Sequence, residues 1–236
     1  MFSKIYLKES LKNALCSLTK IRYAFSRNLT IKAGYVFNSH LTVSAQSFFY
    51  LNGFSIRNSN IVINGNNNEL ICNGKIYNLE ILIEGTDNSI IIENAKEWVK
   101  NTRITIRGNN CRVKIGKNSS INESNIVCMG LNTQIHIGDE CMFAEQIEIW
   151  NTDSHPIFDR DNQDTPINKS KSIYIGNHVW LGSRSVVLKG VHIGENSIVG
   201  LGSIVTKDIP KNVVAVGNPC RIVRENVTWN RNHINL

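Results

Sequence analysis

Aliphatic residues recur every six positions through the C-terminal part of the chain. The spacing holds without interruption at six of them: Ile175, Leu181, Val187, Ile193, Val199 and Val205. Glycine follows four of these residues, and valine or serine stands four positions after each of the first five. A period of six matches neither a helix nor simple strand alternation, but it is typical of parallel β-helices. The pattern therefore predicts short strands joined by tight bends, with about 18 residues in each triangular coil.

A longer and less regular repeat precedes the hexads. Its four units begin with isoleucine at positions 61, 81, 104 and 126, with glycine fifth and asparagine or aspartate seventh. Both positions suit a sharp corner, because glycine and asparagine readily adopt positive φ values. A Gly/Asn-rich β-sandwich is the alternative, but continuity with the hexads favours a single β-helix. By this alignment the next unit begins at Ile147, Asn151 replaces the corner glycine, and Asp153 holds the seventh position.

A polar segment then interrupts the repeat. Residues 154–172 carry no strand pattern and contain two of the four prolines of the chain. A long loop without a pattern of its own inside a compact repeat is usually functional or disordered. Because this loop begins with Ser154-His155, we expect an active-site loop that protrudes from one corner of the prism.

The length of 236 residues indicates one folded unit with short flanking segments. We expect a basic helical segment at residues 1–30, the β-helix at 31–222 and a tail at 223–236. The helical segment would either cap the open end of the β-helix or rest on an anionic membrane through residues 1–27. The net charge of +7 is compatible with an anionic ligand, and no nucleic-acid-binding motif is present.

The cysteines and the apolar runs indicate the compartment. The six cysteines have no metal-binding spacing, and several occupy core-type strand positions. No apolar run is long enough to span a membrane or to form a signal peptide. We therefore expect reduced thiols and a cytoplasmic protein, with contact at the inner face of the membrane as an option.

The C-terminal repeats resemble those of the hexapeptide-repeat acyltransferases. The resemblance rests on IYIGNHVWLGSRSVVLKGVHIGENSIVGLGSIVTKDIP at 173–210 and AVGNPCRIVR at 215–224. Within that family the chain is similar to the O-acetyltransferases of galactosides, maltose, nodulation factors and xenobiotics. The segment EIWNTDSHP at 148–156 most resembles acetyltransferases of capsular polysaccharides, including polysialic acid. The strong match covers about residues 104–224.

This resemblance implies a left-handed parallel β-helix that assembles as a homotrimer. The left-handed sense rests on the resemblance alone, because left-handed crossovers between parallel strands are rare. The family transfers an acetyl group from acetyl-CoA to a hydroxyl, without a metal, in grooves between neighbouring subunits. The protruding loop is expected to cover such a groove.

The chemistry of acetyl transfer requires a base, because an alcohol is almost wholly protonated at neutral pH. A histidine can take that proton and return it to the leaving thiolate. His155 lies at the mouth of the loop, and the resemblance implies that it is the base. Asp153 or Glu148 could orient its imidazole, as a carboxylate does in a catalytic triad. Glu148 alternates with Ile147 and Ile149, so it should point out of the core.

The resemblance also implies the remaining site residues. Trp180 is too large for the prism interior, so we expect it to project from a corner and line the pocket near the thioester. Packing at a trimer interface is the alternative for Trp180. Leu201 stands where the family usually has alanine, which would narrow the cofactor groove. The expected contacts of acetyl-CoA are Ser183, Gly200, Leu201 and Ser203 along the pantetheine arm, and Thr206, Lys207, Arg221 and Arg224 near the phosphates.

Other functions of a β-helix fit the sequence less well. A γ-class carbonic anhydrase holds zinc with closely spaced histidines, whereas His178 and His192 lie 14 positions apart. A non-catalytic sugar-binding β-helix would have no need of His155, Trp180 and Lys207 together. The expected acceptor is a sugar hydroxyl of a surface glycan or its precursor. A small xenobiotic, a free sugar and the nitrogen of an amino sugar stay open as acceptors.

Overall fold

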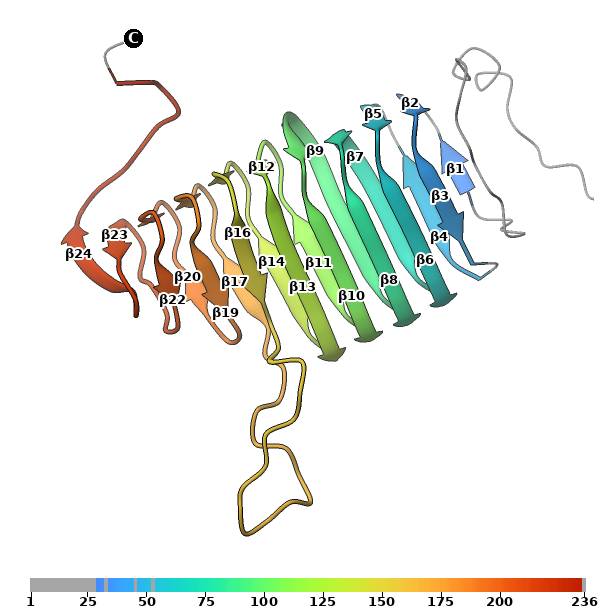
Figure 1. Cartoon of the computed structure of the whole chain (residues 1–236). Helices are drawn as coiled ribbons and strands as arrows, with labels where there is room; N and C mark the ends of the chain where they lie inside the picture. Colours follow the sequence, from blue (N-terminus) through green and yellow to red (C-terminus); the bar gives the residue numbers. More distant parts are fainter. Residues whose placement is uncertain (1–28, 32–33, 45, 52–53, 235–236) are drawn as a thin grey trace, which may run out of the picture.

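A computed structural model describes residues 29–234, apart from residues 32–33, 45 and 52–53. All regular elements of this part are β-strands, which wind into a three-faced prism (Figure 1). The helix expected over residues 1–30 lies almost entirely outside the described residues, as does its membrane contact. Its predicted C-terminal boundary is wrong, because Leu29 and Thr30 belong to a strand. No described helix is long and apolar enough to cross a membrane.

In the described part of the chain, the first face of the prism is a sheet of eight parallel strands, one from each coil. They are β3 (His40–Val43), β6 (Asn60–Asn66), β8 (Glu80–Thr86), β10 (Arg103–Asn109), β13 (Ser124–Leu131), β16 (Ile147–Trp150), β19 (Val186–Leu188) and β22 (Ile204–Val205).

The second and third faces form one continuous sheet, because the long strands β7 (Glu69–Tyr77) and β9 (Ser89–Lys100) run across both. The other strands of the second face are β1 (Leu29–Ile31), β4 (Phe48–Leu51), β11 (Arg112–Ile115), β14 (Gln134–Ile137), β17 (Ile173–Ile175) and β20 (His192–Ile193). Those of the third face are β2 (Gly34–Phe37), β5 (Phe54–Arg57), β12 (Ser120–Asn122), β15 (Met142–Phe143), β18 (Trp180–Leu181), β21 (Ile198–Val199) and β23 (Val213–Val216). A final antiparallel strand, β24 (Arg221–Glu225), pairs with β23.

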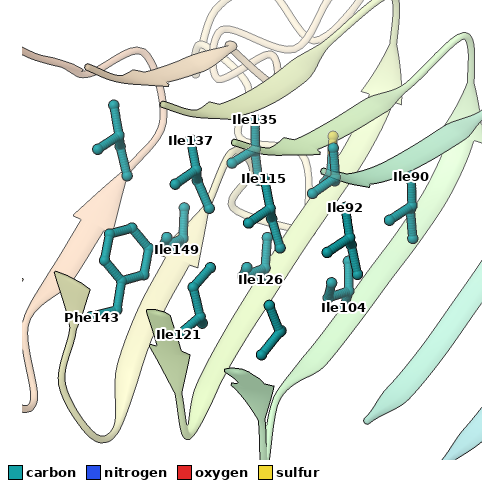
Figure 2. Packing of buried hydrophobic residues seen from close by; sticks show 14 of the residues in the cluster. Ile90, Ile92, Ile104, Ile115, Ile121, Ile126, Ile135, Ile137, Phe143 and Ile149 are labelled. Atoms are coloured by element: carbon teal, nitrogen blue, oxygen red, sulfur yellow. The ribbon is translucent and has the colours of Figure 1, made fainter. Parts of the chain in front are cut away.

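Aliphatic side chains from the three faces stack rung on rung inside the prism (Figure 2). Ile104 pairs with Ile126, and Ile126 pairs with Ile149 on the next coil. All three are fully buried. Burial of one such side chain contributes about 1.5–3 kcal/mol, and each coil covers the open end of its neighbour. The six-residue period therefore reports the inward-facing positions, as predicted.

The corners are formed by three columns of residues with positive φ values. We name the turn from the first to the second face the first corner, and the following turns the second and third corners. The predicted glycines stack at the first corner, where Gly65 pairs with Gly85 and Gly108 pairs with Gly130. A Cβ atom on Gly65 would lie 2.0 Å from the Gly85 carbonyl oxygen, so only glycine fits. The asparagines and aspartate at the seventh position have φ values of 52–58°, which confirms their predicted role: Asn67, Asp87, Asn110 and Asn132.

The predicted alignment of the last irregular unit is wrong by two residues. Ile126 pairs with Ile149 rather than with Ile147, so Asn151 does not replace a corner glycine. Asn151 is instead fully buried. Its side-chain amide accepts a hydrogen bond from the Met129 amide at 2.7 Å and donates to the Met129 carbonyl at 3.1 Å. The side chain thus replaces backbone hydrogen bonds at the point where the chain leaves the coil.

Five cysteines lie in the described part of the chain, and all are buried and unpaired: Cys72, Cys111, Cys128, Cys141 and Cys220. This agrees with the prediction of reduced thiols. Cys16 lies outside the described residues.

Candidate active site

A loop leaves the first corner after β16 and returns to the prism at β17. It projects away from the coils as a long arm (Figure 1). Three residues, which we call the latch, hold together the outgoing and returning segments at the base, or neck, of the loop: Asp153, Asn168 and Lys189. The Lys189 ammonium contacts the Asp153 carboxylate and donates to the Asn168 carbonyl at 3.1 Å. The Asn168 side-chain amide donates to the same carboxylate oxygen of Asp153 at 2.8 Å.

The latch is electrostatically favourable at neutral pH. The hydrogen bond from Lys189, followed by the one from Asn168, lowers the pKa of Asp153 below its ordinary value. A lowered pKa means that the contact stabilises the neck above the ordinary pKa of an aspartate. This stabilisation is lost only as the pH falls through the lowered pKa of the folded state.

The same asparagine fixes the backbone around His155. Its Nδ2 donates to the His155 carbonyl at 2.9 Å, and its Oδ1 accepts from the Ile157 amide at 2.7 Å. The His155 amide donates to the Asp153 carbonyl at 2.7 Å. The main chain of His155 is therefore held on both sides, while its side chain stays exposed. An open cavity adjoins it, lined by Gly130, Leu131, Thr133, Thr152, Ser154, His155, Pro156, Pro166, Asn168, Lys169 and Ser170.

The two carboxylates expected to orient the imidazole occupy different places. Asp153 contacts Lys189 and Asn168, as described above. Glu148 points out of the core, as predicted, and accepts from the Trp150 indole at 2.6 Å and the Asn125 amide at 2.8 Å. It lines a groove along the third corner, whereas His155 lies at the first. Among the described residues of one chain, neither carboxylate contacts the His155 ring.

Trp180 projects outward, as expected, but from a face rather than a corner. It opens strand β18 and is 36% exposed. Its ring centre lies 5.9 Å from that of Trp229, at an interplanar angle of 49°. No repeat or motif in the sequence points to Trp229, because it follows the last coil. Asn168 and Lys189 were missed for a similar reason, since their contacts depend on how the loop returns to the prism.

Most of the residues expected along the pantetheine arm lie together at the third corner. The Gly202 amide donates to the Ser183 carbonyl at 2.8 Å, which brings Gly200 and Leu201 beside Ser183. Leu201 is 65% exposed, so its side chain projects from this corner. Ser203 differs from the expectation, because its hydroxyl is fully buried and accepts from the Gly217 amide at 3.0 Å. Its backbone is buried as well, because the Ser203 carbonyl accepts from the Val186 amide at 2.8 Å, so Ser203 is not open to a ligand.

The residues expected near the phosphates are all exposed. Thr206 and Lys207 follow β22 at the first corner, one coil beyond Lys189. Arg221 and Arg224 lie on β24, where the Arg221 guanidinium donates to the Cys220 carbonyl at 2.8 Å. In the described part of the chain, no three His, Cys, Asp or Glu side chains gather as metal ligands.

The expected site residues therefore divide between two edges of the first face. His155, Thr206 and Lys207 belong to the first corner. Ser183, Gly200 and Leu201 belong to the third corner, with Trp180 on the adjoining third face. One chain does not bring the two groups together.

Comparison with known sequences agrees with the repeats. The family model described as bacterial transferase hexapeptide (six repeats) matches residues 172–207. The galactoside O-acetyltransferase of Lactococcus lactis is 45% identical over 94 residues, which cover 40% of this chain and 44% of the relative. That of Escherichia coli is 47% identical over 91 residues, which cover 39% and 44%. The chain thus spans less than half the length of these curated relatives.

Two solved structures match nearly the whole chain. The polysialic acid O-acetyltransferase OatWY is 31% identical with a TM-score of 0.65, over 91% of this chain and 92% of that one. The polySia-specific acetyltransferase NeuO is 28% identical with a TM-score of 0.58, over 92% of each chain. These matches confirm the predicted fold, an all-β, left-handed parallel β-helix. The chain belongs to the hexapeptide-repeat acetyltransferase family.

Proposed function

We propose that this chain is an acetyl-CoA-dependent O-acetyltransferase that acts on a sugar hydroxyl of a surface glycan or its precursor, with His155 as general base. The proposal rests on the way the base of the loop holds His155. The main chain of His155 is fixed by Asn168 and Asp153 while its side chain stays exposed beside a cavity. A base must be held in this way to act on a bound hydroxyl.

In the proposed mechanism the imidazole of His155 takes the proton from the acceptor hydroxyl as its oxygen attacks the thioester carbonyl. A tetrahedral intermediate forms and then collapses. The carbon–sulfur bond breaks, and the imidazolium returns the proton to the thiolate of coenzyme A. The products are the acetyl ester and free coenzyme A, with the histidine restored to its starting state.

We further propose that three chains assemble around the first face. Its outward side chains form a mostly apolar column around the buried Val127, and a single chain leaves the other members partly exposed: Val62, Leu82, Thr105, Trp150 and Leu188. Threefold closure around this face would bury the column and set the first corner of one chain against the third corner of its neighbour. His155 would then meet the neighbour's Ser183 and Leu201, so the site is complete only in the trimer.

The same arrangement favours Glu148 over Asp153 as the carboxylate that orients the imidazole. Asp153 is already ion-paired with Lys189, whereas the hydrogen bonds that Glu148 accepts come from the neutral groups of Trp150 and Asn125. Glu148 lies on the edge of the first face next to the third corner. In the trimer this edge would face the neighbour's loop, so Glu148 of one chain would approach His155 of the next.

Substitution of Lys207 tests the expected place of the cofactor. Lys207→Ala should weaken the binding of acetyl-CoA by about tenfold, because a cation near the phosphates is lost. Binding of acetyl-pantetheine, which lacks the adenosine phosphates, should change little. Isothermal titration with both donors measures the difference. Equal losses for the two donors would mean that Lys207 does not contact the phosphates.

The latch makes a separate prediction. Asn168→Ala should lower kcat/KM by about tenfold, because the backbone of His155 loses a partner and the base is less well positioned. The matched control is Asn162→Ala in the same loop, where the side chain accepts only from the Asp164 amide. The control should keep its activity. If both variants behave alike, Asn168 has no special role in placing His155.

The acceptor class is tested by release of coenzyme A from acetyl-CoA in the presence of different acceptors. The names of the two matching structures make polysialic acid the first polymer to try. A galactoside and a small hydroxylated antibiotic represent the alternatives. Mild alkali removes an O-acetyl ester but not an N-acetyl amide, so mass spectrometry before and after alkali identifies the bond formed. Turnover only with the small acceptors would contradict a role in glycan modification.

A further inference from the structure

The C-terminal tail runs back along the second corner of the prism after β24. The Val227 amide donates to the Asn212 carbonyl at 3.0 Å, and the Asn196 side chain donates to the Val227 carbonyl at 3.1 Å. The Thr228 hydroxyl donates to the Asn196 side-chain oxygen at 2.8 Å. The guanidinium of Arg231 then donates to the Cys141 carbonyl at 2.8 Å. Residues 227–231 are thus attached to successive coils.

Trp229 is the buried residue among the described residues of this tail. Its indole nitrogen donates to the His178 carbonyl at 2.8 Å. Its ring stacks flat on the His178 imidazole, with centres 4.1 Å apart and an interplanar angle of 5°. Only 8% of Trp229 is exposed. The Trp229 ring also lies against Trp180, whose ring centre is 5.9 Å away.

The neighbours of Trp180 explain why this contact matters. On the sheet Trp180 pairs with Met142 on one side and Ile198 on the other. Both are flexible or aliphatic side chains, so neither fixes the orientation of an indole by a ring contact. We propose that Trp229 is a positioning residue, which holds the Trp180 ring in the orientation that acetyl transfer requires. This inference rests on the proposed acetyl transfer and on the place expected for Trp180 beside the thioester.

The coils do not depend on the tail for their own hydrogen bonds. At the second corner the His178 amide donates to the Asp139 carbonyl at 2.7 Å, and the Asn196 amide donates to the Asn177 carbonyl at 2.9 Å. The corner is therefore complete before the tail is added. Loss of the Trp229 ring should disturb Trp180 more than it disturbs the prism.

A double-mutant cycle tests the inference. Trp229→Ala should lower kcat by about tenfold, because the reacting groups are less well aligned. Trp229→Phe should recover most of this loss, since it restores a ring, whereas Trp229→Leu should not. If Trp229 acts through Trp180, then Trp229→Ala should cause no further loss in a Trp180→Ala background. The dissociation constant of coenzyme A should stay unchanged in the Trp229 variants.

Controls separate this role from a structural one. Trp98, with the same exposed fraction as Trp180, packs against Tyr77 on the N-terminal coils, so Trp98→Ala should keep kcat. Unchanged kcat in Trp229→Leu, or independent losses that multiply in the double variant, would overturn the inference. Full activity of Trp180→Ala would also overturn it. That result would leave His155 as base, because the His155→Ala variant tests the proposed reaction separately.

Discussion

His155→Ala is expected to lower the turnover of acetyl transfer by about 10²–10⁴-fold, the usual contribution of a positioned general base. Without the imidazole no group at the neck of the loop takes the proton from the acceptor hydroxyl. The side chain is exposed, so its removal should leave the prism unchanged. The loss of turnover is measured from the rate at which coenzyme A is released. Calorimetry measures the binding of acetyl-CoA, which should persist.

The matched control for this prediction is His192→Ala. His192 is also an exposed histidine of the C-terminal coils, but it lies on the second face in β20. Its substitution should keep turnover close to that of the unmodified protein. Near-normal turnover of His155→Ala would remove this residue from the mechanism, whatever the control does.

Shortening the loop should have the second largest effect. The amide of Ile167 donates to the Ile157 carbonyl at 2.8 Å, so residues 158–166 form a tip beyond a closed neck. Replacing this tip by Gly-Ser keeps His155, Asn168 and the latch. Transfer to a glycan should fall by about 10²-fold, because an acceptor that is no longer covered is poorly positioned.

The stability of the shortened protein distinguishes a lid from a structural strap. The apolar side chains of the loop face solvent, with Ile157 and Ile167 53% and 67% exposed. They add little to the core of their own chain, so the melting temperature should hardly change. Light scattering should still report three times the chain mass of 26.6 kDa. Unfolding or dissociation into monomers would mean that the loop mainly holds the assembly together.

The fold was predictable because each coil repeats the same physical requirements. An inward aliphatic residue is needed on every rung, and a corner must turn sharply on every coil. The first requirement is met by the six buried residues that recur every six positions from Ile175 to Val205. Gly65, Gly85 and Gly108 satisfy the second, since a side chain there would collide with the next coil. Such constraints appear in the sequence as spacing, and spacing can be read without a structure.

The parts that were missed depend on contacts that carry no spacing. Asn151 is a buried asparagine at a position where the neighbouring coil has a cysteine, so an alignment by residue type shifts the register by two. Lys189 and Asn168 meet only because the arm returns to the corner from which it left. Trp229 reaches His178 across 51 positions. Ser203 is a different case, because its burial follows the strict repeat, in which Ser185 and Ser197 are buried at the equivalent position.

The central claim is that one acetyl-transfer site is built from the first corner of one chain and the third corner of its neighbour. Mixing two inactive variants tests it most directly. His155→Ala removes the base at the first corner, and Ser183→Trp fills the cofactor groove at the third. When equal amounts are unfolded together and reassembled, about a quarter of the sites should pair an intact first corner with an intact third corner. The account predicts that about a quarter of the normal activity returns in the mixture, although each variant alone is inactive. Activity no higher than that of the separate variants, in mixed trimers confirmed by mass spectrometry, would contradict it.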